Sequence, residues 1–182
     1  MSRRPGRPAE AVLDLRAIAG AAADVLRAEG MEALSVRAVA TRLGVTPMAV
    51  IARAGSRDGM VAAMLAEVFA GVAVGGGAAE ARVVAGLESY AAAAMAAPGA
   101  VTLMLSRPEL IPAVLDRFGA EIAAALAEGG MDAGAARRGR DILIDHGHGA
   151  LIAAALAPAA ARQAVAAEYR VAMRHLVRAL FG

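Results

Sequence analysis

The sequence contains no cysteine, no tryptophan and no lysine, and aromatic residues make up only 3% of its 182 residues. Without cysteine there are no disulfides and no thiolate metal ligands, which suits a reducing compartment. So few aromatic side chains also predict no well-formed stacking cage for a planar ligand. The longest uncharged segment, residues 89–106, is rich in alanine and is divided by Pro98-Gly99. A membrane-spanning helix is therefore not expected, and we expect a cytoplasmic protein.

Recognisable catalytic patterns are also missing from the sequence. It shows no nucleophile–base pairing, no phosphate-binding loop and no pair of catalytic acids. Asp141, Asp145 and His148 share one predicted helical face, with His146 beside them, and such a set can converge on a metal ion. Interface hydrogen bonds or simple exposure explain these residues without a metal. We therefore expect no enzymatic activity, no cofactor and no metal site.

Charge is unevenly distributed along the chain. Residues 1–60 contain nine arginines and six acidic residues, a net charge of +3, whereas the remainder contains ten arginines and eleven acidic residues, a net charge of −1. A basic excess at one end is expected where that end meets an anionic polymer such as DNA.

Helical patterns extend over nearly the whole sequence. Hydrophobic residues make up 59% of it, and alanine, the best helix former, dominates them. Glycines, prolines and capping residues separate the helical segments, no alternation typical of strands is present, and Gly75-Gly76-Gly77 is the clearest seam between domains. The sequence predicts an all-α fold with helices over residues 9–29, 35–44, 46–55, 57–74, 78–97, 100–105, 108–129, 132–157 and 158–180.

Residues 36–54 have the spacing of a helix-turn-helix. Small Ala40 lies where two short helices must cross closely, Gly44 follows four positions later, and apolar Val50 lies six positions beyond the glycine. Glycine suits a turn that requires a positive φ angle. Many two-helix corners share part of this pattern, so the assignment of a helix-turn-helix also depends on the neighbouring sequence.

The neighbouring sequence resembles the DNA-binding domain of the TetR family of bacterial transcriptional regulators. The resemblance extends from about Ala17 to Met64, over four consecutive predicted helices and their caps. The residues that carry it are Ala21-Ala22, Leu26, Glu29-Gly30, Leu34-Ser35-Val36-Arg37, Val39-Ala40, Leu43-Gly44-Val45-Thr46, Ala49-Val50, Gly55-Ser56-Arg57-Asp58 and Met60-Val61.

This resemblance implies an N-terminal three-helix helix-turn-helix domain and a C-terminal helical bundle for ligand binding and dimerisation. It divides the chain into a disordered basic arm (1–8), a DNA-binding domain (9–56), a connecting helix (57–74) and a ligand-binding and dimerisation domain (75–182). It also implies a regulator, by family habit a repressor, that binds a palindromic double-stranded DNA operator as a homodimer. A small apolar effector would release it. The alternative is a helical ligand-binding or adaptor protein with a degenerate DNA-binding domain.

The resemblance also predicts which residues contact DNA. Thr46, Pro47 and Met48 open the third helix, which enters the major groove in this family; a hydroxyl can contact a base or phosphate there, and a methionine a thymine methyl. Ile51 departs from the family, which usually has a tyrosine at this position. Arg53 lies where a histidine is common and can supply a charged phosphate contact instead.

Further predicted DNA contacts lie outside the third helix. Arg37 belongs to the helix before it, while Ser56 and Arg57 open the fourth helix, where free N–H groups and a guanidinium suit a phosphate. A solvated surface is the simpler explanation for these arginines. The N-terminal arm has a Gly-Arg-Pro centre that resembles an AT-hook for the minor groove, or it is a solubilising tail; its arginines are Arg3, Arg4 and Arg7.

The remaining predictions concern the C-terminal half. Gly147 and Gly149 lie inside the first of the last two predicted helices, where close approach of a partner helix or ligand would offset their low helix propensity. We expect the homodimer interface on these two helices. An adaptable apolar pocket is expected beside them, although the same residues could form plain core. Its predicted lining residues are Met64, Tyr90, Met95, Leu103, Met104, Ile144, His146 and Leu151.

Overall fold

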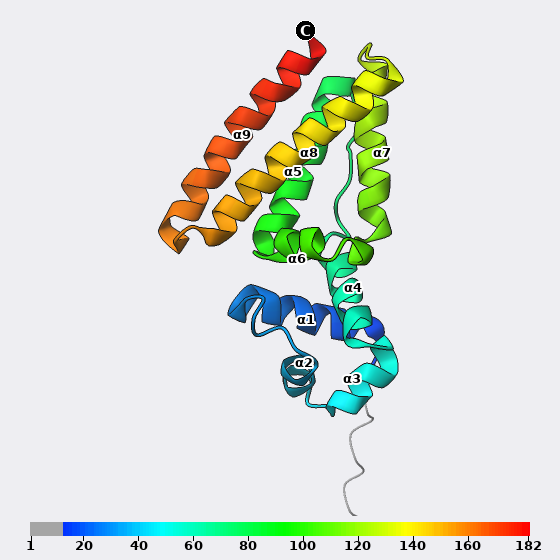
Figure 1. Ribbon diagram of the computed structural model, residues 1–182, viewed down its shortest axis with the longest axis vertical. Helices are drawn as coiled ribbons and strands as arrows, with labels where there is room; N and C mark the ends of the chain where they lie inside the picture. The colour runs from blue at the N-terminus through cyan, green and yellow to red at the C-terminus, as the bar shows by residue number, and fades with distance from the viewer. Residues whose placement is uncertain (1–12) are drawn as a thin grey trace, which may run out of the picture.

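A computed structural model describes residues 13–182 of the chain, and its regular elements there are helices (Figure 1). The expected all-α fold is confirmed. In chain order the elements are α1 (Leu15–Glu29), α2 (Val36–Leu43), α3 (Pro47–Ala54), α4 (Arg57–Val68), α5 (Ala79–Ala96), α6 (Ala100–Ser106), the 3-10 turn η1 (Pro108–Leu110), α7 (Ala113–Glu128), α8 (Ala133–Leu156) and α9 (Ala159–Phe181).

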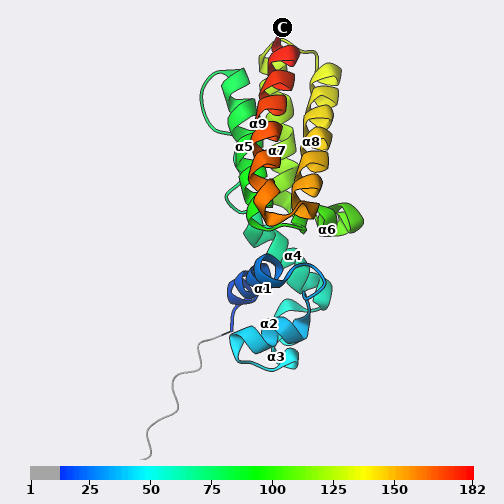
Figure 2. The same cartoon turned by 90° about the vertical axis from the view of Figure 1, so that its left-hand side faces the viewer.

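The helices form a smaller lower body and a larger upper bundle, joined by α4 (Figures 1 and 2). The lower body contains α1, α2 and α3, and α1 packs along α4. The upper bundle contains α5, α7, α8 and α9 running lengthwise, with α6 lying crosswise at its base. Because α4 leaves the lower body and ends in the bundle, it connects the two physically.

Local capping fixes the helices of the lower body. The Ser35 hydroxyl accepts a hydrogen bond from Ala38 N at 3.1 Å at the start of α2, and the Thr46 hydroxyl accepts one from Ala49 N at 3.2 Å at the start of α3. Between them Gly44 has φ +67°, a left-handed conformation that glycine adopts without strain. The predicted boundaries of α2 and α3 are confirmed.

Three predicted helix boundaries are wrong. The Asp14 carboxylate accepts a hydrogen bond from Ala17 N at 2.6 Å and so caps α1 at Leu15, whereas the helix was expected from residue 9. Residues 9–12 lie outside the described part of the chain. The connecting helix α4 ends at Val68 rather than residue 74, because the chain unwinds into turns before Gly71, a poor helix former.

The third wrong boundary lies after α6. A single helix was expected over residues 108–129, but η1 and α7 are separate elements. Pro112 lacks an N–H donor and disfavours the helical region for the residue before it, and Ile111 accordingly has an extended backbone with ψ 125°. The break places Ile111 between two helices, where it lines a cavity described below.

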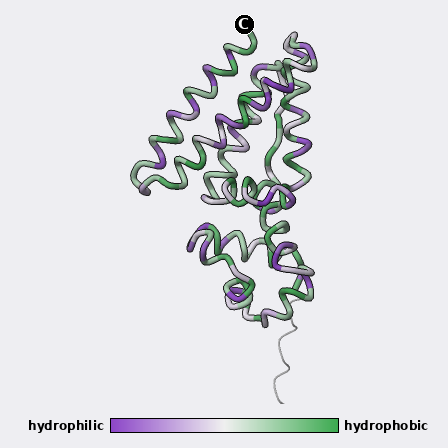
Figure 3. Tube along the Cα trace, viewed as in Figure 1, coloured by the Kyte–Doolittle hydropathy of each residue, from purple (hydrophilic) through white to green (hydrophobic). Residues whose placement is uncertain are grey.

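The hydrophobic core is continuous through both bodies. Fully buried side chains include Ile18 and Leu26 on α1, Met64 on α4, Leu87 on α5 and Ile122 on α7. Along α8, hydrophilic residues gather in the first half and hydrophobic residues in the second (Figure 3). Within residues 13–182, no single helix combines the length and hydropathy of a membrane span, and α5 with α6 reaches them only as a pair bent by 98°.

Candidate nucleic-acid interface and ligand cavity

Helix α3 lies on the outside of the lower body. Of its side chains only Val50 is fully buried, and it fastens the helix to the core. Thr46 and Pro47 are exposed at its start, and Met48 is 72% exposed, which is high for a large hydrophobic side chain. An eight-residue helix attached by one side and open along the other has the shape that enters a DNA major groove.

The arginines predicted to contact DNA are exposed around this helix. Arg37 lies on α2, Arg53 in the last turn of α3 and Arg57 at the first position of α4. Arg57 also reaches the Leu34 carbonyl in a long contact of 3.5 Å, which holds its side chain against the start of α2. The Ser56 hydroxyl accepts a hydrogen bond from Gly59 N at 2.9 Å and so caps α4.

The predicted DNA interface also includes the position of Ile51 and the N-terminal arm. Ile51, at the position where tyrosine is usual, is half-buried, and Ala52 beside it is exposed. The arm arginines Arg3, Arg4 and Arg7 lie outside the described residues.

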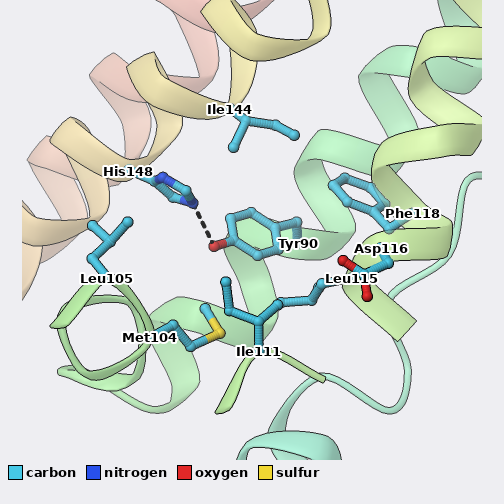
Figure 4. A pocket seen from close by; sticks show the side chains of 9 residues that line it. All are labelled: Tyr90, Met104, Leu105, Ile111, Leu115, Asp116, Phe118, Ile144 and His148. Carbon is cyan, nitrogen blue, oxygen red and sulfur yellow. Dashed lines mark hydrogen bonds between the residues drawn. The ribbon is translucent and has the colours of Figure 1, made fainter. Parts of the chain in front are cut away.

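A cavity of about 150 Å³ lies at the base of the upper bundle, where α5, α6, α7 and α8 meet (Figure 4). Its lining is almost entirely apolar, and a tyrosine, a histidine and an aspartate supply its polar groups. The lining residues are Tyr90 on α5, Met104 and Leu105 on α6, Ile111 between η1 and α7, Leu115, Asp116 and Phe118 on α7, and Ile144 and His148 on α8.

A hydrogen bond joins the tyrosine and the histidine of the cavity wall. Tyr90 Oη and His148 Nε2 are 3.0 Å apart, and Figure 4 shows the pair reaching across from α5 to α8. Burial raises the pKa of the Tyr90 hydroxyl above its ordinary range. Burial also lowers the pKa of His148, against the opposing attraction of Asp145. Both side chains are therefore uncharged near pH 7.

Aromatic side chains are concentrated at this cavity despite their scarcity in the sequence. The Tyr90 ring lies between Phe69 and Phe118, with ring centroids 5.5 and 5.6 Å away and an interplanar angle of 17° in each case. Three of the five phenylalanine and tyrosine residues thus form one stack. Composition does not predict this clustering, but because both faces of the Tyr90 ring are covered, the stack is not a cage for a planar ligand.

The structure sorts the predicted ligand-lining residues into different places. Tyr90, Met104 and Ile144 come together in the cavity. Met64 is fully buried in the core, and Leu103 is half-buried without lining the cavity. The other three lie elsewhere: Met95 and Leu151 line a crevice of about 20 Å³, and His146 lines a groove on the α8–α9 face.

Sequence reasoning missed several cavity residues. The clearest is His148, which was considered as a metal ligand or as an interface or exposed residue but not as a cavity residue, although it lies four residues after Ile144 and therefore on the same face of α8. Phe118, Leu115 and Ile111 could not be assigned without knowing that α7 begins at Ala113. No group of three histidine, aspartate or glutamate side chains within residues 13–182 is placed to hold a metal ion.

A groove between α8 and α9, which we call the α8–α9 face, contains two ring side chains whose polar atoms have no partner in the described part of the chain. The groove is lined by His146, Ala150, Ala164, Val165, Glu168, Tyr169 and Ala172. His146 stacks on Tyr169 with ring centroids 5.9 Å apart, and neither His146 Nε2 nor the Tyr169 hydroxyl finds a hydrogen-bond partner within residues 13–182. Burial raises the pKa of Tyr169 to about 12. The hydroxyl lies only 3.2 Å from where a Cβ on Gly147 would be, whereas Gly149 has open space on its side of α8.

Together, the outward helix and the cavity bundle define a helix-turn-helix domain joined to a separate C-terminal helical domain. The sequence model of the family described as "Bacterial regulatory proteins, tetR family" matches residues 18–64, which contain α2, α3 and most of α1 and α4. The N-terminal part of the chain is thus similar to the DNA-binding domain of the TetR family. No curated protein matches the sequence.

Solved structures share the fold over nearly the whole chain at low sequence identity. One is BioQ with its double-stranded DNA operator, with a TM-score of 0.76 and 15% identity, covering 93% of this chain and 98% of that chain. Another is the TetR family protein ActR of Streptomyces coelicolor in complex with (S)-DNPA. It has a TM-score of 0.73 and 19% identity, and the match covers 92% of this chain and 96% of that chain. A third is a TetR variant from Acinetobacter baumannii AYE in complex with minocycline. It has a TM-score of 0.74 and 15% identity, and the match covers 92% of this chain and 96% of that chain.

Proposed function

We propose that this protein is a repressor that binds a palindromic operator as a homodimer and leaves it when a small apolar ligand enters the cavity. The observation that carries the proposal is α3, attached through Val50 and open along the face that begins with Thr46, Pro47 and Met48. The surrounding arginines add phosphate contacts, which position the helix without reading sequence. BioQ, which shares the fold, was solved on its operator.

The α8–α9 face supports the homodimer. Residues 142, 146, 149, 153 and 156 of α8 follow one another at spacings of four and three, the repeat of a helix that packs against another helix. Ile142 and Leu156 on this stripe are 54% and 82% exposed, and Val171 on α9 is 66% exposed. A second copy packed there would cover these side chains and allow close contact at Gly149.

Two-fold symmetry then explains how two recognition helices read one site. A dimer through α8 and α9 carries one copy of α3 on each protomer, and a separation of about 34 Å places both in successive major grooves. The matching DNA is a pseudo-palindrome. The proposed domain division follows: the arm and residues to 56 contact DNA, α4 connects, and residues from 75 onward bind ligand and partner.

The cavity supports the release by a ligand. Its wall includes α6 and Ile111, the residue after η1, and η1 packs against α4, so its contents can affect the position of the DNA-binding domain. ActR and the TetR variant, which share the fold, were each solved with a small molecule. A coupling that changes operator occupancy 5- to 150-fold is typical of such linked sites.

Selection of bound fragments from random double-stranded DNA with the full chain tests the proposal. We expect a pseudo-palindrome whose half-sites lie about one helical turn apart. Met48→Ala should weaken binding to the selected site, because it removes a groove-facing side chain. Met31→Ala is the matched control, since Met31 is an exposed methionine in the turn between α1 and α2.

The alternative, a ligand-binding protein with a degenerate DNA-binding domain, is favoured by Ile51 at the usual tyrosine position. It predicts no enriched sequence and no salt-sensitive retardation of promoter fragments in a gel. A strictly monomeric chain in solution would also contradict the proposed operator binding.

A further inference from the structure

The size of the cavity limits the ligand. Drug-sized ligands occupy pockets of roughly 300–1,000 Å³. The cavity here is about 150 Å³ and is lined by aromatic, aliphatic and methionine side chains. Apolar cavities of about this volume bind benzene. One six-membered ring with a single small substituent therefore fills the space, and a larger ligand requires the walls to move.

The apolar walls favour a flat ring. Phe69 and Phe118 cover the two faces of the Tyr90 ring, so this ring offers its edge to the cavity, and Met104 belongs to the same wall. Aromatic rings also pack well edge to face, and methionine sulfur makes favourable contacts with ring edges. A planar ligand gains these contacts at the same time.

The Tyr90–His148 pair supplies one spare hydrogen-bond donor. If the tyrosine hydroxyl donates to Nε2, the neutral imidazole keeps its proton on Nδ1. If instead Nε2 donates to the hydroxyl oxygen, the tyrosine proton remains available. With either tautomer, one N–H or O–H of the pair remains free to donate a hydrogen bond. A carbonyl or ether oxygen on the ligand can accept it.

The charges of the cavity wall disfavour the binding of ionic ligands. Asp116 is the acidic side chain of the wall, and no arginine belongs to the lining, so a carboxylate or phosphate would find no counter-charge there. A cation gains little, because Asp116 is exposed and its field is screened by solvent. Moving an ammonium group among apolar walls costs hydration that this weak attraction does not replace.

We propose that the ligand is an uncharged molecule the size of a singly substituted benzene ring, whose acceptor oxygen binds the Tyr90–His148 pair. This inference rests on the proposed function, which makes the cavity the effector site. Binding to the full chain in the absence of DNA tests the inference alone, and release of the selected operator tests the proposed function.

Four probes of similar size separate the possibilities by calorimetry: toluene, benzaldehyde, benzoate and benzylammonium. We expect benzaldehyde to bind about 3- to 10-fold more tightly than toluene, the factor that one net hydrogen bond provides. Benzoate and benzylammonium should each bind at least 10-fold more weakly than benzaldehyde. Tightest binding by either ion, or binding by none of the four, would overturn the proposed ligand class.

Matched tyrosine variants test the polar contact. Tyr90→Phe should bring benzaldehyde to within about twofold of toluene while toluene binding persists, which also shows that the variant is folded. Tyr169→Phe is the control, because it removes a hydroxyl from the α8–α9 face and should keep the preference. If Tyr90→Phe and His148→Phe both keep the preference, the assigned contact is wrong. Ile144→Phe, which fills the cavity, should weaken the binding of both neutral probes, and unchanged affinity would place their site elsewhere.

Discussion

The guanidinium of Arg107 donates a hydrogen bond to the carboxylate of Asp58 across 2.8 Å. Arg107 follows α6, within four residues of Leu105 and Ile111 in the cavity wall, whereas Asp58 lies in the first turn of α4 beside Arg57. Glu109 also pairs with Arg107 and, together with Asp58, raises its pKa. One charged side chain thus joins the cavity wall to the helix that begins beside α3.

This link predicts that Arg107 transmits ligand binding to the DNA-binding domain. Arg107→Gln should reduce the effect of a saturating neutral ligand on operator affinity at least threefold, because displacement of α6 and η1 no longer pulls on α4. Operator affinity with and without benzaldehyde, measured by fluorescence anisotropy, gives this ratio. Benzaldehyde affinity in the absence of DNA should stay within about twofold of wild type.

Arg117→Gln is the control for this substitution. Arg117 pairs with Glu121 on the same helix at 3.7 Å, and its side chain is 69% exposed. It should leave the ligand effect unchanged. Equal behaviour of the two variants would show that the Arg107–Asp58 contact plays no part in coupling.

The α8–α9 face predicts a dimer that one charge can disrupt. Val171→Arg places an unpaired guanidinium in the proposed interface, where its desolvation opposes association. Sedimentation should show a dimer dissociation constant raised more than tenfold, and operator affinity should fall with it. Ala120→Arg introduces the same charge at an exposed position on α7 and should remain dimeric. A dimer that persists in Val171→Arg would place the interface elsewhere.

Local features were predictable from the sequence, while side-chain clustering was not. Ser35, Thr46 and Gly44 act on backbone groups within a few residues, so their types and spacing were enough to define α2 and α3. The cavity depends on which faces of α5, α7 and α8 meet, and periodicity alone gives each helix an apolar face without naming its partner. Met64 was therefore assigned to the pocket although it lies in the core, and His148 was left out although it lines the cavity.

Backbone conformation at the turn between α2 and α3 gives a stability prediction. Gly44 has φ +67°, and an L-residue pays about 1–2 kcal/mol in this left-handed region. Gly44→Ala should lower the free energy of unfolding in urea by about that amount and weaken operator binding, since the turn sets the angle of α3. Gly71→Ala is the control: Gly71 is not among the glycines with positive φ, and no atom lies within 4 Å of an added Cβ. Its unfolding free energy should change little or rise, because alanine restricts the unfolded chain.

The pKa of His148 predicts how stability depends on pH. Burial lowers this pKa in the folded chain below the ordinary value of about 6.5, and the attraction of Asp145 offsets only part of the effect. As the pH falls through about 6.5, the unfolded chain binds a proton that the folded chain does not yet accept, so the free energy of unfolding decreases. Above that pH the contribution to stability is fully present.

Comparison of two histidine variants isolates this contribution. His148→Asn should flatten the decrease in unfolding free energy between about pH 7.5 and 5.5, because the variant has no imidazole to protonate in the unfolded chain. His175→Asn removes an exposed histidine from α9 and should keep the wild-type profile. Since protonated His148 can no longer accept a hydrogen bond from Tyr90, benzaldehyde affinity should change at lower pH, where the folded chain takes up this proton, in wild type but not in His148→Asn. A pH-independent affinity in wild type would mean that the ligand does not depend on the pair.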